Sequence, residues 1–354
     1  MTNTAKPTRQ SNVELLRIVC MIMIMSHHFI VHTMDSFSAL PMATRVFNAL
    51  CYVAVNCYVL ISGYFRIKLS WKRLFYYVFF CVFYALAINA ANRLVAGGSI
   101  GRTLIYESLF VFTHTPSWYE SLFVFTHNPS WWFITIYLAL MLMSPVLNAG
   151  IESLARKKMA WALAAALVVD VYLGWWAKAD NGYSLIHFII MYYIGAFLSK
   201  GDVLDDFLPT SRHAKRSLLL VVYAGAMVLW NWLVAVSPTY GRGDGDGYVT
   251  YNDPLVILGS TAFFALFLTF DFRSRIVNFA AKSVLAAYLL QEGIRGVYPW
   301  FEQHLMHSDP YLNILITLAT GTIFVIVAIG IDQLRSAAYQ AAMALFSVVK
   351  KHKR

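Results

Sequence analysis

Residues 12–35, NVELLRIVCMIMIMSHHFIVHTMD, decide the fold class of this chain. The stretch from 15 to 34 is almost entirely apolar, and about 20 such residues are enough for a helix to cross a bilayer. Glu14 and Arg17 stand at its head, and no small-residue cleavage site follows it, so it does not resemble a secretory signal sequence. We therefore interpret this stretch as a membrane-spanning helix.

Nine further apolar runs follow it, and the run at 277–299 is interrupted by Gln291, Glu292 and Arg295. Of the 354 residues, 59% are hydrophobic and 13% are charged, whereas a soluble domain is about half apolar and about a quarter charged. This composition excludes a soluble globular enzyme and a disordered chain. We expect one all-α, polytopic membrane helix bundle over 1–354, with an N-terminal stub at 1–12 and a basic C-terminal tail at 334–354. The ten expected spans are 15–34, 46–65, 74–92, 131–150, 159–176, 184–199, 217–236, 254–271, 277–299 and 311–333.

The net charge is +10, and the basic residues that cause it are distributed as the expected topology predicts. With the N-terminus inside, the inner segments hold 20 Lys and Arg residues and the outer segments hold 6. Basic residues concentrate in cytoplasmic loops of membrane proteins, so this split predicts that both termini are cytoplasmic. The basic residues are dispersed loop by loop, which argues against a nucleic-acid partner.

The first span carries a polar stripe. At about 100° per residue, Glu14, Arg17, His28 and His32 fall on one face of the helix, whereas His27 points away. Arg17 and His28 are eleven residues apart, which is about 16 Å along the axis. Ionisable groups inside a membrane are costly and usually functional. An interfacial Glu14–Arg17 ion pair and a structural histidine bonded between helices remain equally good interpretations of the stripe taken alone.

The four cysteines, Cys20, Cys51, Cys57 and Cys81, lie in apolar runs without metal-ligand spacing. They indicate packing, with no disulfide framework and no metal site.

An outer segment contains a tandem duplication. Residues 106–118 and 119–131 are identical except at Thr115 and Asn128. We interpret it as a lengthened outer loop, because loops tolerate insertion at little cost. The alternative is that its repeated side chains line a substrate mouth: Glu107, His114, Glu120 and His127.

A family resemblance rests on several blocks in order. Arg17-x10-His28, preceded by Glu14 and followed by the block VNCYVLISGYF (55–65), is similar to the first and second helices of the acyltransferase 3 family. Three later blocks also resemble that family: WWFITIYLALMLMSPVLN (131–148), HFIIMYYIGAFLSK (187–200) and YNDPLVIL (251–258). The closest variant in character is the bacterial O-acetyltransferase of exopolysaccharides and surface glycans.

The resemblance implies a membrane O-acyltransferase of the bacterial cytoplasmic membrane. It would transfer an acyl group, acetyl by expectation, from cytoplasmic acyl-CoA to a glycan hydroxyl. Its partners would be acyl-CoA, a glycan or lipid-linked saccharide, and the bilayer, with no bound cofactor. A transporter or flippase for lipid-linked glycans is the alternative function, and a purely structural membrane protein is a third.

The resemblance also implies roles for residues. His28 would act as general base or carry the acyl group, Arg17 would hold the donor and Glu14 would orient Arg17. The inner turn with Arg66, Lys72 and Arg73 would bind CoA phosphates, although topology charge alone explains it equally well. Candidate substrate-binding residues are Asn56, Ser62, Trp131 and Glu292.

Two positions depart from the family pattern. The turn RIKLSWKRL lacks the Arg-x-x-Arg motif common in the family. Many relatives also carry a histidine near the ninth span, where this chain reads YLLQEGIR; Gln291 cannot titrate, although Glu292 can.

Overall fold

The computed structural model describes residues 9–33, 40–98, 100–102, 105, 108, 131–176, 181–201, 203–237, 240, 251–294 and 296–352. Apart from Ser108 and Trp131, the tandem duplication at 106–131 lies outside these residues, including Glu107, His114, Glu120 and His127.

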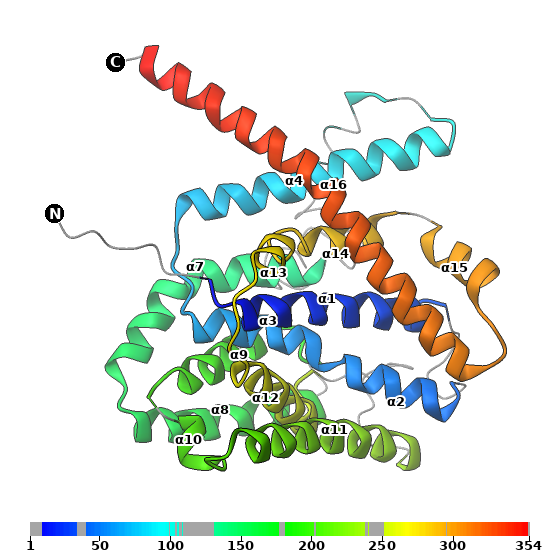
Figure 1. Ribbon diagram of the computed structural model, residues 1–354. Helices are drawn as coiled ribbons and strands as arrows, with labels where there is room; N and C mark the ends of the chain where they lie inside the picture. Colours follow the sequence, from blue (N-terminus) through cyan, green and yellow to red (C-terminus); the bar gives the residue numbers. More distant parts are fainter. Residues whose placement is uncertain are drawn as a thin grey trace.

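Every regular element within the described ranges is an α-helix (Figure 1). The helices are α1 (Ser11–Val31), α2 (Met42–Cys51), α3 (Val53–Tyr64), α4 (Trp71–Val95), α7 (Trp132–Ser153), α8 (Arg156–Trp175), α9 (Leu185–Leu198), α10 (Val203–Phe207), α11 (Arg212–Val236), α12 (Pro254–Leu268), α13 (Arg275–Ala280), α14 (Leu285–Gly293), α15 (Val297–Leu305) and α16 (Pro310–His352).

Six stretches of the described chain are helical, long and apolar enough to cross a membrane. They are α1, α2 with α3 (Met42–Tyr64), α4, α7, α11 and Pro310–Ala341 of α16. Two shorter apolar helices, α9 and α12, have 14 and 15 residues and lie where spans were expected. The 20-residue helix α8 covers another expected position. The all-helical, membrane-type fold is therefore confirmed, and the number of ten spans stays a prediction.

The expected ninth span, 277–299, is not one helix. It is divided among α13, α14 and α15. Ile294, after α14, is extended, and Gly296 has a φ of 86°, in the left-handed region that glycine adopts without a steric penalty. Together with the turn at 281–284, this break leaves α14 as a nine-residue helix with Gln291 and Glu292 in its last turn.

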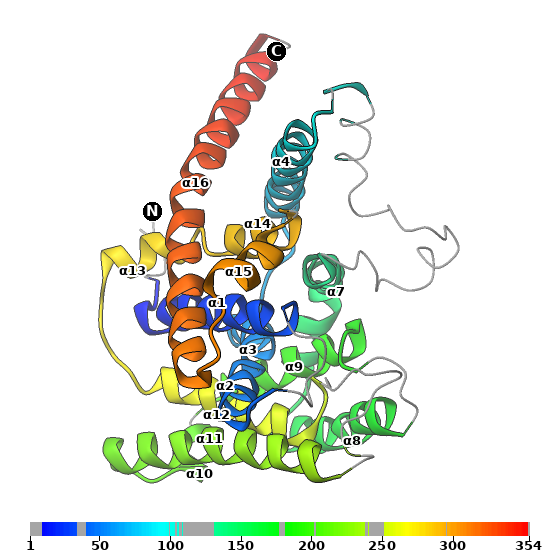
Figure 2. The ribbon, with the colours of Figure 1, turned by 90° about the vertical axis from the view of Figure 1, so that its right-hand side faces the viewer.

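Helix α1 lies at the centre of the bundle (Figures 1 and 2). It contacts α2, α3, α12, α13, α14 and α16. Helix α14 packs against both α4 and α16, which stand on either side of it in Figure 2. The N-terminal ends of α1 and α4 and the C-terminal end of α16 lie on the same side of the bundle, to the left in Figure 1. Helix α1 thus contacts other helices along its length.

Helices α3 and α9 meet through two glycines. A Cβ atom on Gly63 would lie 1.9 Å from the carbonyl oxygen of Tyr192, and one on Gly195 would lie 2.2 Å from that of Leu60. Small residues let helices approach closely in membrane proteins, where packing drives association. This contact fixes the register between α3 and α9.

Candidate active site

His28 lies near the C-terminal end of α1 and contacts the short helix α14. Its Nδ1 atom is 2.9 Å from Oε1 of Glu292 and 3.1 Å from Oε1 of Gln291. The side chains of His28 and Glu292 are 15% and 12% exposed. Hydrogen bonds to an ionised group are strong in such a partly dry environment. The structure thus brings Glu292, expected at the substrate, directly to the expected catalytic histidine.

Hydrogen-bond directions determine which ring nitrogen of His28 carries the proton. Gln291 donates through Nε2 to the carbonyl oxygen of Met25, 3.2 Å away. A carbonyl only accepts, so the Oε1 atom of Gln291 is the one turned toward His28. Two accepting oxygens therefore face Nδ1, and the neutral ring has its proton there. The lone pair is then on Nε2, which gives His28 the tautomer of a base.

Glu292 also contacts Tyr298 on α15 and His32, which directly follows α1. The hydroxyl of Tyr298 donates to its Oε1 atom at 2.7 Å, and Nε2 of His32 lies 3.7 Å from the same oxygen. The side chain of His32 is 45% exposed. Glu292 therefore joins a partly buried histidine and an exposed one.

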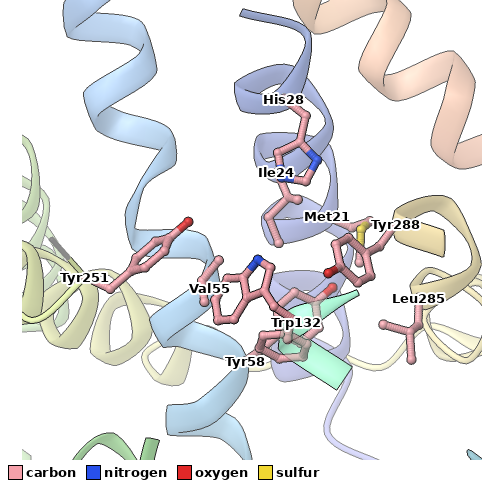
Figure 3. Close-up of a pocket in the computed structure, with 10 residues that line it drawn as sticks. Met21, Ile24, His28, Val55, Tyr58, Trp132, Tyr251, Leu285 and Tyr288 are labelled. Atoms are coloured by element: carbon pink, nitrogen blue, oxygen red, sulfur yellow. The ribbon is translucent and has the colours of Figure 1, made fainter. Parts of the chain in front are cut away.

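A pocket begins at His28 (Figure 3). Figure 3 shows His28 at one end of it and Tyr58 and Leu285 toward the other. The wall has an aliphatic part and an aromatic part. The aliphatic part consists of Met21, Ile24, Val55 and Leu285, and the aromatic part of Tyr58, Trp132, Phe133, Tyr251 and Tyr288. Pockets with mostly apolar walls and a few convergent polar groups are typical ligand sites.

Arg17 and Glu14 form an ion pair in the first two turns of α1. Nη1 of Arg17 lies 3.1 Å from both carboxylate oxygens of Glu14. The Glu14 side chain is 8% exposed and that of Arg17 is 31% exposed. Arg9 adds a second cation, 3.5 Å from Glu14. The arrangement agrees with Glu14 orienting Arg17, and the guanidinium remains partly accessible.

Aromatic side chains continue from the pocket along α7 and α3. The hydroxyl of Tyr58 donates to the carbonyl oxygen of Arg17 at 2.6 Å. Phe133 stacks on Tyr137 with the ring centroids 5.9 Å apart, and the Tyr137 hydroxyl lies 3.4 Å from Oγ of Ser62. Ser62, a sequence-predicted substrate residue, therefore lies beside this aromatic path and not in the pocket wall.

The predicted phosphate-binding residues lie around the start of α4. Lys72 and Arg73 are exposed in its first turn. Arg66 precedes them, with its side chain 35% exposed and Nη1 3.9 Å from Oε1 of Glu152. The N-terminal ends of α4 and α1 share one side of the bundle (Figure 1). The role of the three cations as donor-binding residues stays a prediction.

Two further predicted substrate residues lie away from the pocket. Asn56 is fully buried and bonded to other protein groups. Trp131 is 4% exposed within the hydrophobic core, and its neighbour Trp132 lines the pocket instead. Trp131 is the residue before α7, where the helical period does not yet determine which side chain faces inward.

Sequence reasoning did not place Gln291 or four aromatic rings at the site, those of Tyr58, Phe133, Tyr251 and Tyr288. An apolar pattern marks tyrosines as core or interface residues and does not distinguish those that border a cavity. For Gln291 a signal existed, because a polar residue next to Glu292 in an apolar run needs a partner. Among the described residues, no group of three or more His, Cys, Asp or Glu side chains is placed to hold a metal ion.

Comparison with known proteins adds one match. The family model of acyltransferase 3, described as "Acyltransferase domain", matches residues 10–332. No curated protein and no solved structure matches the chain. The match contains the whole of the polar stripe, the pocket and α14, and it confirms the resemblance seen in the sequence blocks.

Proposed function

The chain belongs to the acyltransferase 3 family, and from that premise we propose that it transfers an acyl group from acyl-CoA to a hydroxyl group of a glycan. The observation that carries the proposal is the state of His28. Its Nδ1–H is held by Glu292 and Gln291, and the ring borders a pocket. A histidine held in this way is a general base ready to accept a proton through Nε2.

The reaction follows from that tautomer. Nε2 of His28 takes the proton of the glycan hydroxyl while the hydroxyl oxygen attacks the thioester carbon. A new C–O ester bond forms, the C–S bond breaks, and the CoA thiolate leaves. The imidazolium returns its proton to the thiolate, so His28 ends neutral and the products are an ester and a free thiol. Glu292 stabilises the imidazolium because its carboxylate lies 2.9 Å from Nδ1.

The cations near the start of α4 support a donor site there. The first turn of a helix has free N–H groups and favours anions, so two cations in that turn are unfavourable without an anionic partner. Lys72 and Arg73 occupy that turn of α4, which has no side-chain cap. The phosphates of acyl-CoA are suitable anions. With Arg17, these cations form the donor site, and the acyl arm extends about 16 Å from Arg17 to His28.

The two parts of the pocket wall suit the two reacting groups. We assign the aliphatic side chains of Met21, Ile24 and Leu285 to the acyl group. We assign Trp132 and Tyr251 to the acceptor, because sugar rings pack their C–H faces on aromatic rings. We propose acetyl as the acyl group, as expected from the resemblance to glycan O-acetyltransferases.

The orientation follows from the donor. Acyl-CoA is a cytoplasmic metabolite, so the N-terminal ends of α1 and α4 face the cytoplasm, and so do both chain termini. The expected 20-to-6 distribution of basic residues supports the same orientation. We propose the bacterial inner membrane as the location, with the ten spans expected from the sequence, of which the ninth is divided among α13, α14 and α15. The glycan then approaches His28 from the outer side.

The test uses the purified full chain in liposomes with [14C]acetyl-CoA and alkali-deacylated surface polysaccharide from the producing cells. We expect label to enter the polysaccharide as a base-labile ester. His28→Ala should lower the rate by about 10²-fold or more, as expected for a lost general base. The control is His213→Ala, at an exposed position of α11. Full activity of His28→Ala would refute the assignment, and glycan movement across the liposome without labelling would identify a transporter instead.

A further inference from the structure

A second histidine, His187 on α9, lies in a fully buried chain of hydrogen bonds. Its Nδ1 atom is 2.8 Å from Oδ2 of Asp170 on α8. Its Nε2 atom is 3.0 Å from Oδ1 of Asn56 on α3. All three side chains have no exposed surface. None of them touches the pocket, so the reaction described above does not use them.

The direction of these bonds is determined at one end. Asn56 donates through Nδ2 to the carbonyl oxygen of Tyr251, 3.0 Å away. Since that carbonyl only accepts, Oδ1 of Asn56 faces His187, and Nε2 of His187 carries a proton. One further proton lies between Nδ1 of His187 and the carboxyl group of Asp170. The three hydrogen-bonded side chains are therefore neutral taken together, which lowers the cost of burying them.

The chain of bonds ends on the segment that carries a pocket wall. Tyr251 receives the bond from Asn56, and its own N–H donates to the carbonyl oxygen of Asn181 at 3.0 Å. The next residue, Asn252, donates to the carbonyl oxygen of Asp170 at 3.1 Å. The ring of Tyr251 lines the pocket, and its centroid lies 5.9 Å from that of Trp132. Both rings belong to the part of the wall assigned to the acceptor (Figure 3).

We propose that Asp170, His187 and Asn56 are positioning residues that hold Tyr251 in place as the acceptor wall and so set the affinity for the glycan. The proposal rests on the proposed function. It changes the role expected for Asn56 from direct contact to action through Tyr251. Apolar side chains would join α3, α8 and α9 without burying polar groups, whereas a directional chain fixes one backbone carbonyl.

Three substitutions test these hydrogen bonds one at a time. Asn56→Ala removes the donor to Tyr251, and Asn56→Asp keeps the size but cannot donate when ionised. Asp170→Asn keeps the chain, because an amide donates to Nδ1 of a neutral His187 whose Nε2 remains protonated. With the labelled acetyl-CoA assay and the deacylated polysaccharide, we expect both Asn56 variants to raise the KM for polysaccharide about ten-fold. The KM for acetyl-CoA should stay within about two-fold, and Asp170→Asn should keep the wild-type KM for polysaccharide.

The matched control is Asn231→Ala, which removes another buried amide, on α11, and should leave the KM for polysaccharide unchanged. Hydrogen–deuterium exchange provides a readout that needs no turnover. Asn56→Ala should speed exchange at the N–H of Tyr251, and Asp170→Asn should not. Lower protein abundance with an unchanged KM for polysaccharide would overturn the proposal. Failure of both Asn56 variants to accumulate would also overturn it, because these hydrogen bonds would then be needed for folding.

Failure of the proposed function is distinguishable from failure of this inference. If the wild type transfers no label while exchange at Tyr251 still depends on Asn56, the reaction assignment is wrong and the positioning contact is real. If the wild type transfers label and the Asn56 variants lower kcat with both KM values unchanged, the reaction assignment is right and the acceptor-positioning role is wrong.

Discussion

The Glu292→Gln variant distinguishes two roles of Glu292. The sequence suggested substrate binding, whereas the structure indicates support of His28. The carboxylate of Glu292 lies 2.9 Å from Nδ1 of His28 and also accepts a hydrogen bond from Tyr298. Glutamine keeps the size and an accepting oxygen but removes the charge. Gln291 still accepts from Nδ1, so the tautomer of His28 is preserved. What is lost is the stabilisation of the imidazolium formed during the reaction.

The expected magnitude follows from that contact. A hydrogen bond to a charged group contributes about 1.5–3 kcal/mol. Screening by water is weak, because the Glu292 side chain is 12% exposed. About 1.4 kcal/mol corresponds to ten-fold in rate, so kcat should fall about ten- to hundred-fold. The KM for the glycan should not change, because Glu292 does not line the pocket.

The assay is initial-rate transfer of [14C]acetyl from acetyl-CoA to deacylated polysaccharide, with each rate divided by the amount of protein in the liposomes. The matched control is Glu302→Gln, the same chemical change at an exposed position of α15. It should leave kcat within about two-fold of the wild type, because exposed surface substitutions have small effects.

A different pattern would refute the reasoning. If Glu292→Gln raises the KM for the glycan and leaves kcat unchanged, Glu292 binds the acceptor, as the sequence alone suggested. If it leaves both quantities unchanged, the carboxylate does not assist His28 at all. Either result would remove Glu292 from the catalytic description.

Arg17→Ala should raise the KM for acetyl-CoA about ten-fold or more without changing that for the glycan, measured by varying each substrate in turn; an unchanged donor KM would remove Arg17 from the donor site. Lys72→Glu should likewise raise the donor KM and reduce its dependence on salt, and an effect on the glycan KM alone would contradict the donor assignment. Gly195→Ala should destabilise the protein by at least about 1–3 kcal/mol, seen as a lower Tm in detergent, because its Cβ would lie 2.2 Å from the carbonyl oxygen of Leu60. Gly225→Ala, with open space at its Cβ, is the control, and an equal loss of stability in both variants would contradict the packing argument.

The membrane fold and the stripe of α1 follow from the sequence because both depend on local regularities. Apolar length determines whether a helix can span a bilayer, and the helical period places Arg17 and His28 on one face. Glu14 pairs with Arg17 for the same reason, at i and i+3. These relations need no knowledge of any other helix.

The partners of His28 depend on a break that composition does not locate. The apolar run 277–299 reads as one span, and the turns at 281–284 and at Ile294 and Gly296 make α14 a separate short helix. The contact of Gln291 with both Met25 and His28 is set by how α14 docks on α1. Tertiary packing of this kind is not contained in a local pattern.

The buried hydrogen bonds that join Asp170, His187 and Asn56 could not be predicted from the sequence either. The three residues come from three helices, and each one alone is explained by an ordinary hydrogen bond between helices. The proposed positioning role depends on the three-dimensional structure, in which these hydrogen bonds lead to the carbonyl of Tyr251.

The close contact of α3 with α9 has a consequence for the order of biogenesis. Asn56 and His187 are 131 positions apart, so α3 enters the bilayer long before the ribosome has made α9. Until then the amide of Asn56 lacks its final partners, and Gly63 leaves an open notch for Tyr192. The half-made protein therefore has a polar, indented surface that lipid fills poorly. This surface is where an insertase or chaperone would be expected to hold the nascent chain until α9 arrives and closes it.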